Sequence, residues 1–158
     1  PCPPEGLAAL AEAAKEAGAR GMTLLLENEP ICYADTGVRT AELLRRLSAP
    51  ALRANWDPGN AFAAGEAPYP EGYLALRPFV REVHVKDARR LPGGQCRWTR
   101  LGEGEIDWPR QLRALAEDGF GGFVTVETHL EPRLEATRAN VSALRGMVGL
   151  LKREGGCA

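Results

Sequence analysis

The sequence of 158 residues lacks several features that often reveal what a protein binds. No apolar run approaches the roughly 18 residues of a membrane-spanning helix, so we expect no membrane partner. Acidic and basic residues nearly balance, at 21 and 20, and neither sign forms a charged tail. This balance, with a formal net charge of −1, argues against a nucleic-acid partner.

Cysteine is scarce, and its spacing excludes a common class of metal site. No two cysteines form a CxxC pair, so we do not expect a zinc site built from thiolates. Their even number leaves disulfides open, but free thiols of a cytoplasmic protein are the preferred interpretation. The chain also enters a helical pattern directly, without a signal peptide, which favours the same location. The cysteines are Cys2, Cys32, Cys96 and Cys157.

The sequence does contain a regular alternation of helix-like and strand-like segments. Helical spacing of apolar residues predicts helices at Glu5–Ala17, Thr40–Leu47, Tyr69–Pro78, Asp107–Asp118 and Arg133–Arg153. Short apolar segments between them predict strands at Met22–Glu27, Leu52–Asp57, Glu82–Lys86 and Phe123–Glu127. Strands separated by helices are typical of a parallel α/β sheet. No linker interrupts the order, so we expect residues 1–158 to form a single domain.

Each predicted strand carries a potential metal ligand at or near its carboxyl end. These residues are Glu27, Asp57, His84 and Glu127. Parallel strands bring their carboxyl ends to one rim of a sheet, so the four side chains are expected to converge there. Three carboxylates and one imidazole suit a divalent cation, namely Mn²⁺, Mg²⁺, Co²⁺ or Zn²⁺.

Each of the four residues also has a simpler interpretation. Glu27 and Glu127 can be solvated strand ends, or partners of a lysine. Asp57 precedes Pro58 and can simply initiate a turn. His84 can be a hydrogen-bonded core histidine. Their recurrence at four successive strand ends favours the metal site.

Side chains along the four strands alternate in polarity. One face of each strand is apolar, as in Val83 and Val85, whereas His84 and Lys86 lie on the other face. A polar face that recurs in four strands requires an enclosed polar space, such as the interior of a barrel. The alternative is a set of half-exposed antiparallel strands, which the intervening helices disfavour.

The segment Ala88–Glu105 is the longest part of the chain without a predicted element. It follows the His84 strand on the rim where ligands bind. A loop of this length is usually functional or disordered, and we favour an active-site loop.

At these residues the chain resembles the second half of the xylose-isomerase-like TIM-barrel superfamily, the sugar phosphate isomerases and epimerases. The matching segments are Glu27-Asn28-Glu29-Pro30, Asp57-Pro58-Gly59-Asn60, His84-Val85-Lys86-Asp87, the Gly102–Trp108 stretch and Val126-Glu127. The resemblance implies a parallel (β/α) half-barrel whose four strands correspond to strands 5–8 of a TIM barrel.

A complete barrel needs eight strands and typically about 250 residues. The chain is therefore expected to be a fragment, a natural truncation, or a chain that completes a barrel by pairing. A missing N-terminal half or a homodimer would cover the two open sheet edges.

The resemblance implies a metal-dependent isomerase or epimerase that acts on a sugar or sugar phosphate. In that family the two strand-end glutamates ligate the metal and exchange the proton beside a carbonyl, so Glu27 and Glu127 receive both roles. Asp57 and His84 are then purely ligands. Three alternatives stay open: an inosose-type dehydratase, a non-catalytic half-barrel module, and a nucleic-acid endonuclease. The last is disfavoured because its multi-zinc sites are rich in histidine, and this chain has only two.

Five further residues are predicted to serve the site. Lys86 is expected to hold a substrate oxygen, or else to pair with Glu29 or Asp87. Asn28 and Arg90 are the other candidates for substrate binding. The simpler interpretations are that Asn28 only satisfies the backbone of a turn and that Arg90 is an exposed loop arginine. Asp87 and Asn60 are expected to orient the ligands from behind. His129, just past the last strand, is predicted to be a surface residue.

Overall fold

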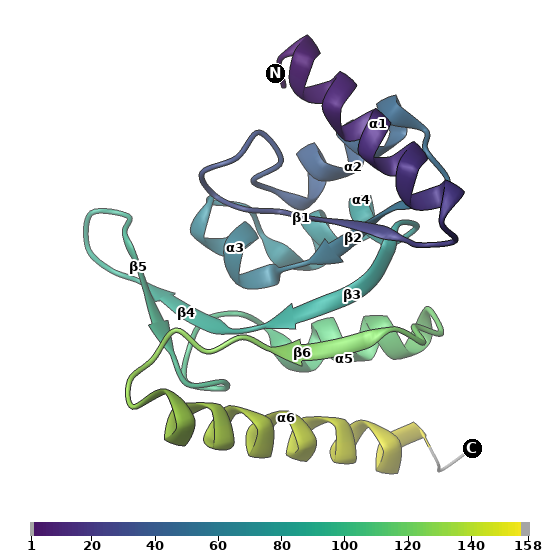
Figure 1. Cartoon of the computed structure of the whole chain (residues 1–158). Helices are drawn as coiled ribbons and strands as arrows, with labels where there is room; N and C mark the ends of the chain where they lie inside the picture. The colour runs from purple at the N-terminus through teal and green to yellow at the C-terminus, as the bar shows by residue number, and fades with distance from the viewer. Residues whose placement is uncertain (1, 156–158) are drawn as a thin grey trace.

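The computed structural model describes residues 2–155 and has a parallel four-stranded sheet at its centre (Figure 1). The strands are β1 (Leu24–Glu27), β2 (Leu52–Trp56), β3 (Val80–Val85) and β6 (Phe123–Val126), in the order β1-β2-β3-β6. All three pairings are parallel. The predicted α/β half-barrel of four strands alternating with helices is confirmed, and the barrel is not closed.

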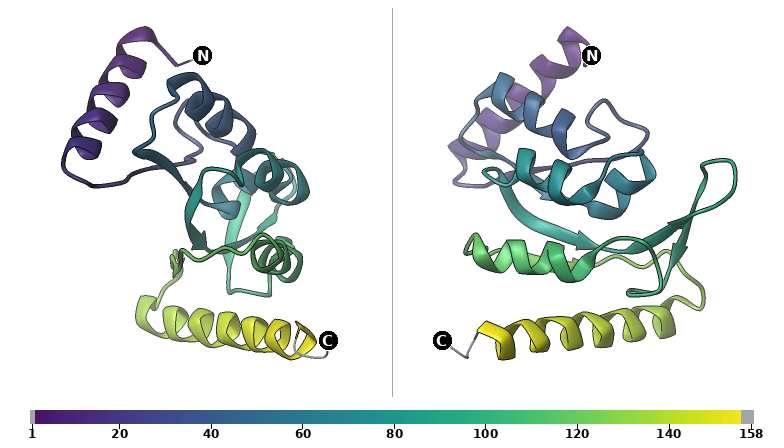
Figure 2. Two further views of the ribbon diagram at one scale, coloured as in Figure 1. Left: turned by 90° about the vertical axis from the view of Figure 1, so that its right-hand side faces the viewer. Right: turned by 180° about the vertical axis from the view of Figure 1, so that it is seen from behind.

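Helices connect the strands and cover one face of the sheet (Figure 2). They are α1 (Pro4–Ala19), α2 (Gly37–Leu47), α3 (Pro58–Ala63), α4 (Tyr73–Leu76), α5 (Trp108–Glu117) and α6 (Arg133–Gly155), with a π-helical turn η1 (Pro68–Gly72) before α4. Helices α1 and α6 lie at opposite ends, beside the edge strands β1 and β6. Among residues 2–155, no further strand pairs with the edge strands β1 and β6.

Alternation along the strands places the core on the helix side of the sheet. Trp56, Val83 and Val85 are fully buried against the helices, as the sequence pattern predicts. Strand β6 differs because it is an edge strand. Val124, on the helix-facing side, is 37% exposed, so the apolar face of this strand is only partly covered, and Phe123 on the opposite face is 79% exposed.

Two local predictions fail in the segments that follow β2 and β3. The expected structureless loop Ala88–Glu105 instead contains most of an antiparallel hairpin, β4 (Asp87–Arg90) and β5 (Cys96–Thr99). Gly93 and Gly94 form its turn with φ values of 92° and 87°, which favour glycine. Helix α3 is also absent from the prediction. It begins at Pro58, and the Asp57 side chain accepts a hydrogen bond from the Asn60 amide at its start.

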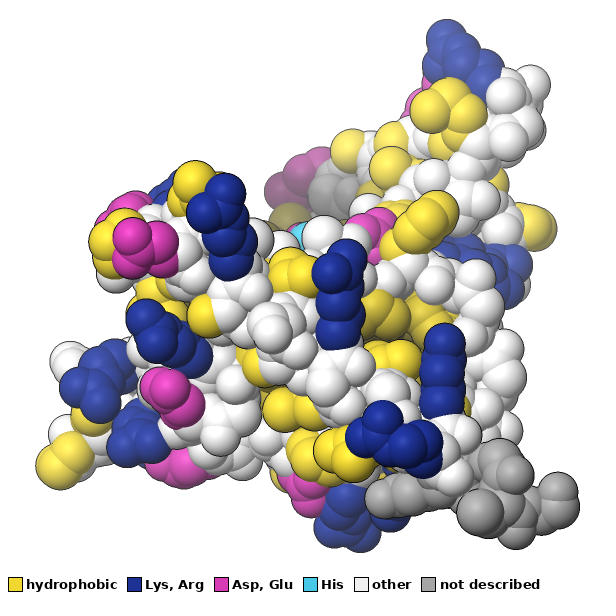
Figure 3. Space-filling model, turned by 90° about the horizontal axis from the view of Figure 1, so that it is seen from below, with side chains coloured by type: hydrophobic (Ala, Val, Ile, Leu, Met, Phe, Trp, Pro, Cys, Tyr) yellow, Lys and Arg dark blue, Asp and Glu magenta, His cyan; other side chains and the backbone are white. Residues whose placement is uncertain are grey.

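Three features bear on partners and cysteine chemistry. Within residues 2–155, no helix is both long and apolar enough to cross a membrane. Cys2, Cys32 and Cys96 carry free thiols, and Cys157 lies outside the described residues. The face of the described chain seen in Figure 3 carries Lys and Arg side chains spread among acidic, apolar and neutral groups.

Glu66 stabilises the start of helix α2 from a distant part of the chain. Its carboxylate accepts hydrogen bonds from the backbone amides of Gly37 (2.7 Å) and Val38 (3.0 Å). These are the first two residues of the helix, whose amides have no partner within the helix. The negative charge also complements the helix dipole.

Replacing Glu66 with Ala is therefore expected to lower the free energy of unfolding by about 2 kcal/mol, because two amide donors lose their acceptor. Urea denaturation followed by circular dichroism measures this change. The matched control is Glu71→Ala, since Glu71 is exposed. It should change stability by less than about 0.5 kcal/mol, and equal effects of the two substitutions would contradict the capping role.

Candidate metal centre

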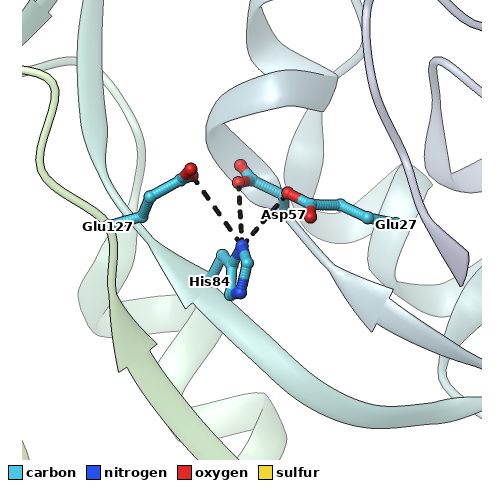
Figure 4. A group of neighbouring side chains, drawn as sticks. All are labelled: Glu27, Asp57, His84 and Glu127. Carbon is cyan, nitrogen blue, oxygen red and sulfur yellow. Dashed lines mark hydrogen bonds and ion pairs between the residues drawn. The ribbon is translucent and has the colours of Figure 1, made fainter. Parts of the chain in front are cut away.

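Four donor side chains meet at the carboxyl ends of the parallel strands (Figure 4). Glu27 ends β1, Asp57 follows β2, His84 lies on β3 and Glu127 follows β6. One ligand atom from each residue lies within 4.8 Å of the corresponding atoms of the other three. The four residues proposed from the sequence as metal ligands are thus brought together.

His84 occupies the middle of the cluster. Its Nδ1 atom is 3.0 Å from Glu27 Oε1, 3.9 Å from Asp57 Oδ2 and 3.8 Å from Glu127 Oε2. Bonds of about 2.1 Å to a shared cation place donor atoms about 3.0 Å apart at right angles and about 4.2 Å apart across the ion. These three distances lie in this range, and all four ligand atoms lie within 4.8 Å of one another, so the cluster is a candidate site for one divalent cation.

Asp57 is the most rigidly held of the four residues. Its side chain is fully buried, and its backbone N–H and C=O both bond to the Asn28 side chain at 2.8 Å. The backbone N–H of Asn60 donates to Asp57 Oδ1 at 2.8 Å. The other oxygen, Oδ2, is buried and has no donor in hydrogen-bond geometry. Lys86 Nζ does lie 2.8 Å from Oδ2 as an ion pair. A buried carboxylate oxygen pointing into the cluster is a suitable metal ligand.

Lys86 contacts the ligand set directly. Its ammonium lies 2.8 Å from Asp57 Oδ2 and 2.5 Å from Glu127 Oε2, and the residue is only 4% exposed. The ion pairs predicted as an alternative, with Glu29 or Asp87, are replaced by pairs with two of the proposed ligands.

His129 lies closer to the site than its sequence position indicates. Its side chain is 39% exposed, but Nε2 is 3.4 Å from both Lys86 Nζ and Glu127 Oε2. Its ring stacks on Trp98 of β5 with centroids 5.1 Å apart, and Lys86 Nζ is 5.1 Å from the Trp98 centroid. The hairpin therefore contributes one wall of the site. The one signal in the sequence for this position is that His129 follows Glu127 by two residues, which puts both side chains on the same side of an extended chain.

The environment shifts the pKa values of the cluster in different directions. Burial raises the pKa of Asp57 to about 7, although the charge of Lys86 opposes the change. Burial also acts to raise the pKa of Glu127, but the hydrogen bond and charge of Lys86 outweigh it, so this pKa is lowered. The hydrogen bond to Glu27 raises the pKa of His84 against the effect of burial.

Asp87 supports the site by fixing the segment that follows the hairpin. Its buried carboxylate accepts hydrogen bonds from the amides of Ala88, Gly102, Gly104 and Ile106, at 2.9 to 3.3 Å. A Cβ atom at Gly104 would lie 2.0 Å from Asp87 Oδ1, so the chain needs glycine there. Asp87 thus orients backbone rather than a metal ligand.

Asn60, Asn28 and Arg90 differ in how they relate to the cluster. The side-chain Nδ2 of Asn60 donates hydrogen bonds to Glu27 Oε1 at 3.4 Å and to Glu29 Oε2 at 3.1 Å, so Asn60 contacts one of the proposed ligands. Asn28 is fully buried and engaged with Asp57, which favours a positioning role over substrate contact. The Arg90 guanidinium lies 4.4 Å from the Phe62 ring and donates to the Phe62 carbonyl, which favours a structural role.

Comparison with known families agrees with this architecture. The chain matches the family described as xylose isomerase-like TIM barrel over residues 5–147. It belongs to the xylose isomerase-like TIM barrel family. No curated protein sequence matches the chain significantly.

Three solved structures illustrate the range of proteins with a similar fold. The probable 3-DHS dehydratase AsbF from Bacillus anthracis is 20% identical, with a TM-score of 0.76 over 89% of this chain and 56% of its own. A protein from Mycobacterium smegmatis in complex with magnesium is 21% identical, with a TM-score of 0.75 over 92% and 50%. A D-allulose 3-epimerase from Methylomonas sp. in complex with D-allulose is 18% identical, with a TM-score of 0.70 over 91% and 54%.

The chain thus spans about half the length of these three proteins, at 56%, 50% and 54%. At these identities the likeness shows the fold alone. The family match and the four-residue cluster together show a xylose isomerase-like TIM-barrel chain with a candidate metal site.

Proposed function

We propose that residues 1–158 are a partial TIM-barrel domain carrying the metal site of a divalent-metal-dependent sugar isomerase or epimerase. Glu27, Asp57, His84 and Glu127 hold the cation, and Glu27 and Glu127 also move the proton. The observation that supports this most strongly is the convergence of four donor atoms within 4.8 Å from four separate strand ends. One similar structure is in complex with magnesium and another binds zinc, which supports a divalent cation and leaves Mn²⁺, Mg²⁺, Co²⁺ and Zn²⁺ as the candidates.

The reaction we propose is proton transfer at the carbon next to a carbonyl group. When bound, the metal supplies positive charge that stabilises the negative charge developing on the substrate oxygens. Glu27 and Glu127 approach His84 from opposite sides (Figure 4). One carboxylate can therefore accept the proton on one face of the substrate while the other, protonated, returns one to the opposite face.

The substrate class that fits this chemistry is a small polyhydroxylated carbonyl compound, either a sugar or a sugar phosphate. The D-allulose bound by the similar epimerase supports a free ketose as the first probe. Trp98 and Lys86 border the cluster and offer an apolar surface and an ammonium group beside it.

A dehydratase is the second candidate, and the likeness to a probable 3-DHS dehydratase favours it over a non-catalytic module or an endonuclease. One glutamate would remove the proton next to the carbonyl, and the hydroxyl group on the adjacent carbon would leave as water with a proton from the other, protonated glutamate. Analysis of the product, a dehydrated rather than a stereoisomeric sugar, separates the two reactions.

The open edges of the sheet support the need for a second half-barrel. Met22, next to β1, is 61% exposed and Phe123 of β6 is 79% exposed. A further N-terminal half or a second copy of this chain would cover them. Light scattering of the purified chain separates these two sources, because only self-association doubles its mass.

Hydrogen exchange at carbon tests the proposed function directly. The chain loaded with Mn²⁺ is incubated with D-allulose in D₂O, and the product is freed of metal and analysed by proton NMR. We expect deuterium to enter the position next to the carbonyl, and EDTA to stop the exchange. Absence of exchange in the metal-loaded chain, with D-allulose and with a panel of ketoses and ketose phosphates, would contradict the proposal.

A further inference from the structure

Lys86 is built into the site more firmly than an ordinary surface lysine. Its stem lies against Gly59, where a Cβ atom would come within 2.5 Å of Lys86 Cγ. Its backbone carbonyl accepts a hydrogen bond from Trp108 Nε1 at 3.1 Å. The ring of Trp98 lies on another side of the ammonium, 5.1 Å away. The fold thus fixes both the direction and the reach of this side chain.

The ammonium of Lys86 and the proposed cation would share the same oxygen atoms. Lys86 Nζ contacts Asp57 Oδ2 and Glu127 Oε2, at 2.8 and 2.5 Å. The same two oxygens face the cluster, where they lie 3.9 and 3.8 Å from His84 Nδ1. The other oxygen of Asp57, Oδ1, accepts a hydrogen bond from the backbone N–H of Asn60. A metal ion in the cluster would therefore lie only a few ångströms from a fixed positive charge.

We propose that Lys86 is a resident counter-cation of the metal site. It neutralises the repulsion between Asp57 and Glu127 before the metal arrives, and it weakens the binding of the metal once the site forms. This inference rests on the proposed function, because it takes the four-residue cluster to be a divalent-metal site. When ionised, the three carboxylates and Lys86 leave two negative charges, which one divalent cation balances.

Removing Lys86 has two opposite effects on metal affinity: it relieves charge repulsion, and it loosens the arrangement of the carboxylates. We expect the first effect to be the larger. Repulsion between a single and a double positive charge about 5 Å apart corresponds to about tenfold in affinity, even when screened as strongly as in water. Asp57 would keep its place without Lys86, since Asn28 holds its backbone and Asn60 its Oδ1 atom. Removing the lysine charge should therefore tighten metal binding.

The test compares Mn²⁺ binding by the wild-type chain and by Lys86→Met, using the electron paramagnetic resonance signal of free Mn²⁺. We expect the variant to bind Mn²⁺ about tenfold more tightly or better. We also expect the metal-free variant to melt about 5 °C or more below the wild type, because a buried carboxylate loses its partner. The control is Lys15→Met, since Lys15 is exposed and pairs only with Glu12 among the contacts described. It should change neither quantity.

The outcomes separate this inference from the proposed function. If the wild type binds Mn²⁺ and Lys86→Met binds it equally or more weakly, the counter-cation role is wrong while the metal site stands. If only the variant binds, the counter-cation role is supported and the native chain is not a metal enzyme. Binding by neither protein overturns both. Should Lys86→Met fail to fold, Lys86→Gln removes the same charge and is measured in its place.

Discussion

Replacing Glu127 with Gln is expected to slow hydrogen exchange at the substrate carbon by about 10³-fold, because the variant loses a general base. Glutamine cannot accept the proton at neutral pH, yet its shape is nearly unchanged. The hydrogen bond from Lys86 to the remaining oxygen can persist. We therefore expect the fold to survive, with a melting temperature of the metal-free chain within about 3 °C of the wild type. Rates come from the deuterium-exchange measurement at saturating Mn²⁺.

The control is Glu131→Gln, four residues further along the chain. Glu131 is exposed and its carboxylate contacts Arg133, not the cluster. Its replacement should leave the exchange rate within about twofold. A Glu127→Gln variant that retains the full rate with Mn²⁺ bound would remove this residue from the proton-transfer role.

Replacing Asp87 with Ala is expected to cost about 3 to 5 kcal/mol of folding free energy. Four backbone amides lose their acceptor at once: those of Ala88, Gly102, Gly104 and Ile106. The melting temperature should fall by roughly 10 °C for a domain of this size. Differential scanning calorimetry of the metal-free chain measures the shift.

Asp87→Asn provides a graded comparison within the same cavity. The amide can keep the oxygen that accepts from Ala88 and Ile106, but its NH₂ group cannot accept from Gly102 and Gly104. We expect Asp87→Asn to have a melting temperature between those of the wild type and Asp87→Ala. A melting temperature of Asp87→Ala equal to that of the wild type would show that these hydrogen bonds are not what orders the segment.

The sequence predicts the strands of the sheet well because alternation and flanking turn residues are local signals. Val83 and Val85 lie on the buried face and His84 on the open one, as their period of two requires. The hairpin β4–β5 was missed because its strands are polar and arginine-rich, and only Gly93-Gly94 marks its turn. Helix α3 was missed because its six residues are too few to show a helical period.

The four donors at the strand ends could be identified from sequence because parallel strands all end on the same rim. Their partners could not. The Asn28 side chain hydrogen-bonds to the backbone of Asp57, 29 positions away, and this contact depends on the register of β1 and β2. Lys86 reaches Asp57 and Glu127 only because Gly59 leaves room for its stem. Such contacts follow from tertiary packing, which has no periodic signature in the sequence.

The most direct test of the central claim is an anomalous difference map from a crystal of the chain loaded with Mn²⁺. The predicted result is a single strong peak per chain, with Glu27, Asp57, His84 and Glu127 each contributing an atom at roughly 2.0–2.3 Å. A map in which Mn²⁺ lies elsewhere, or in which this cluster is empty at saturating metal, would contradict the account.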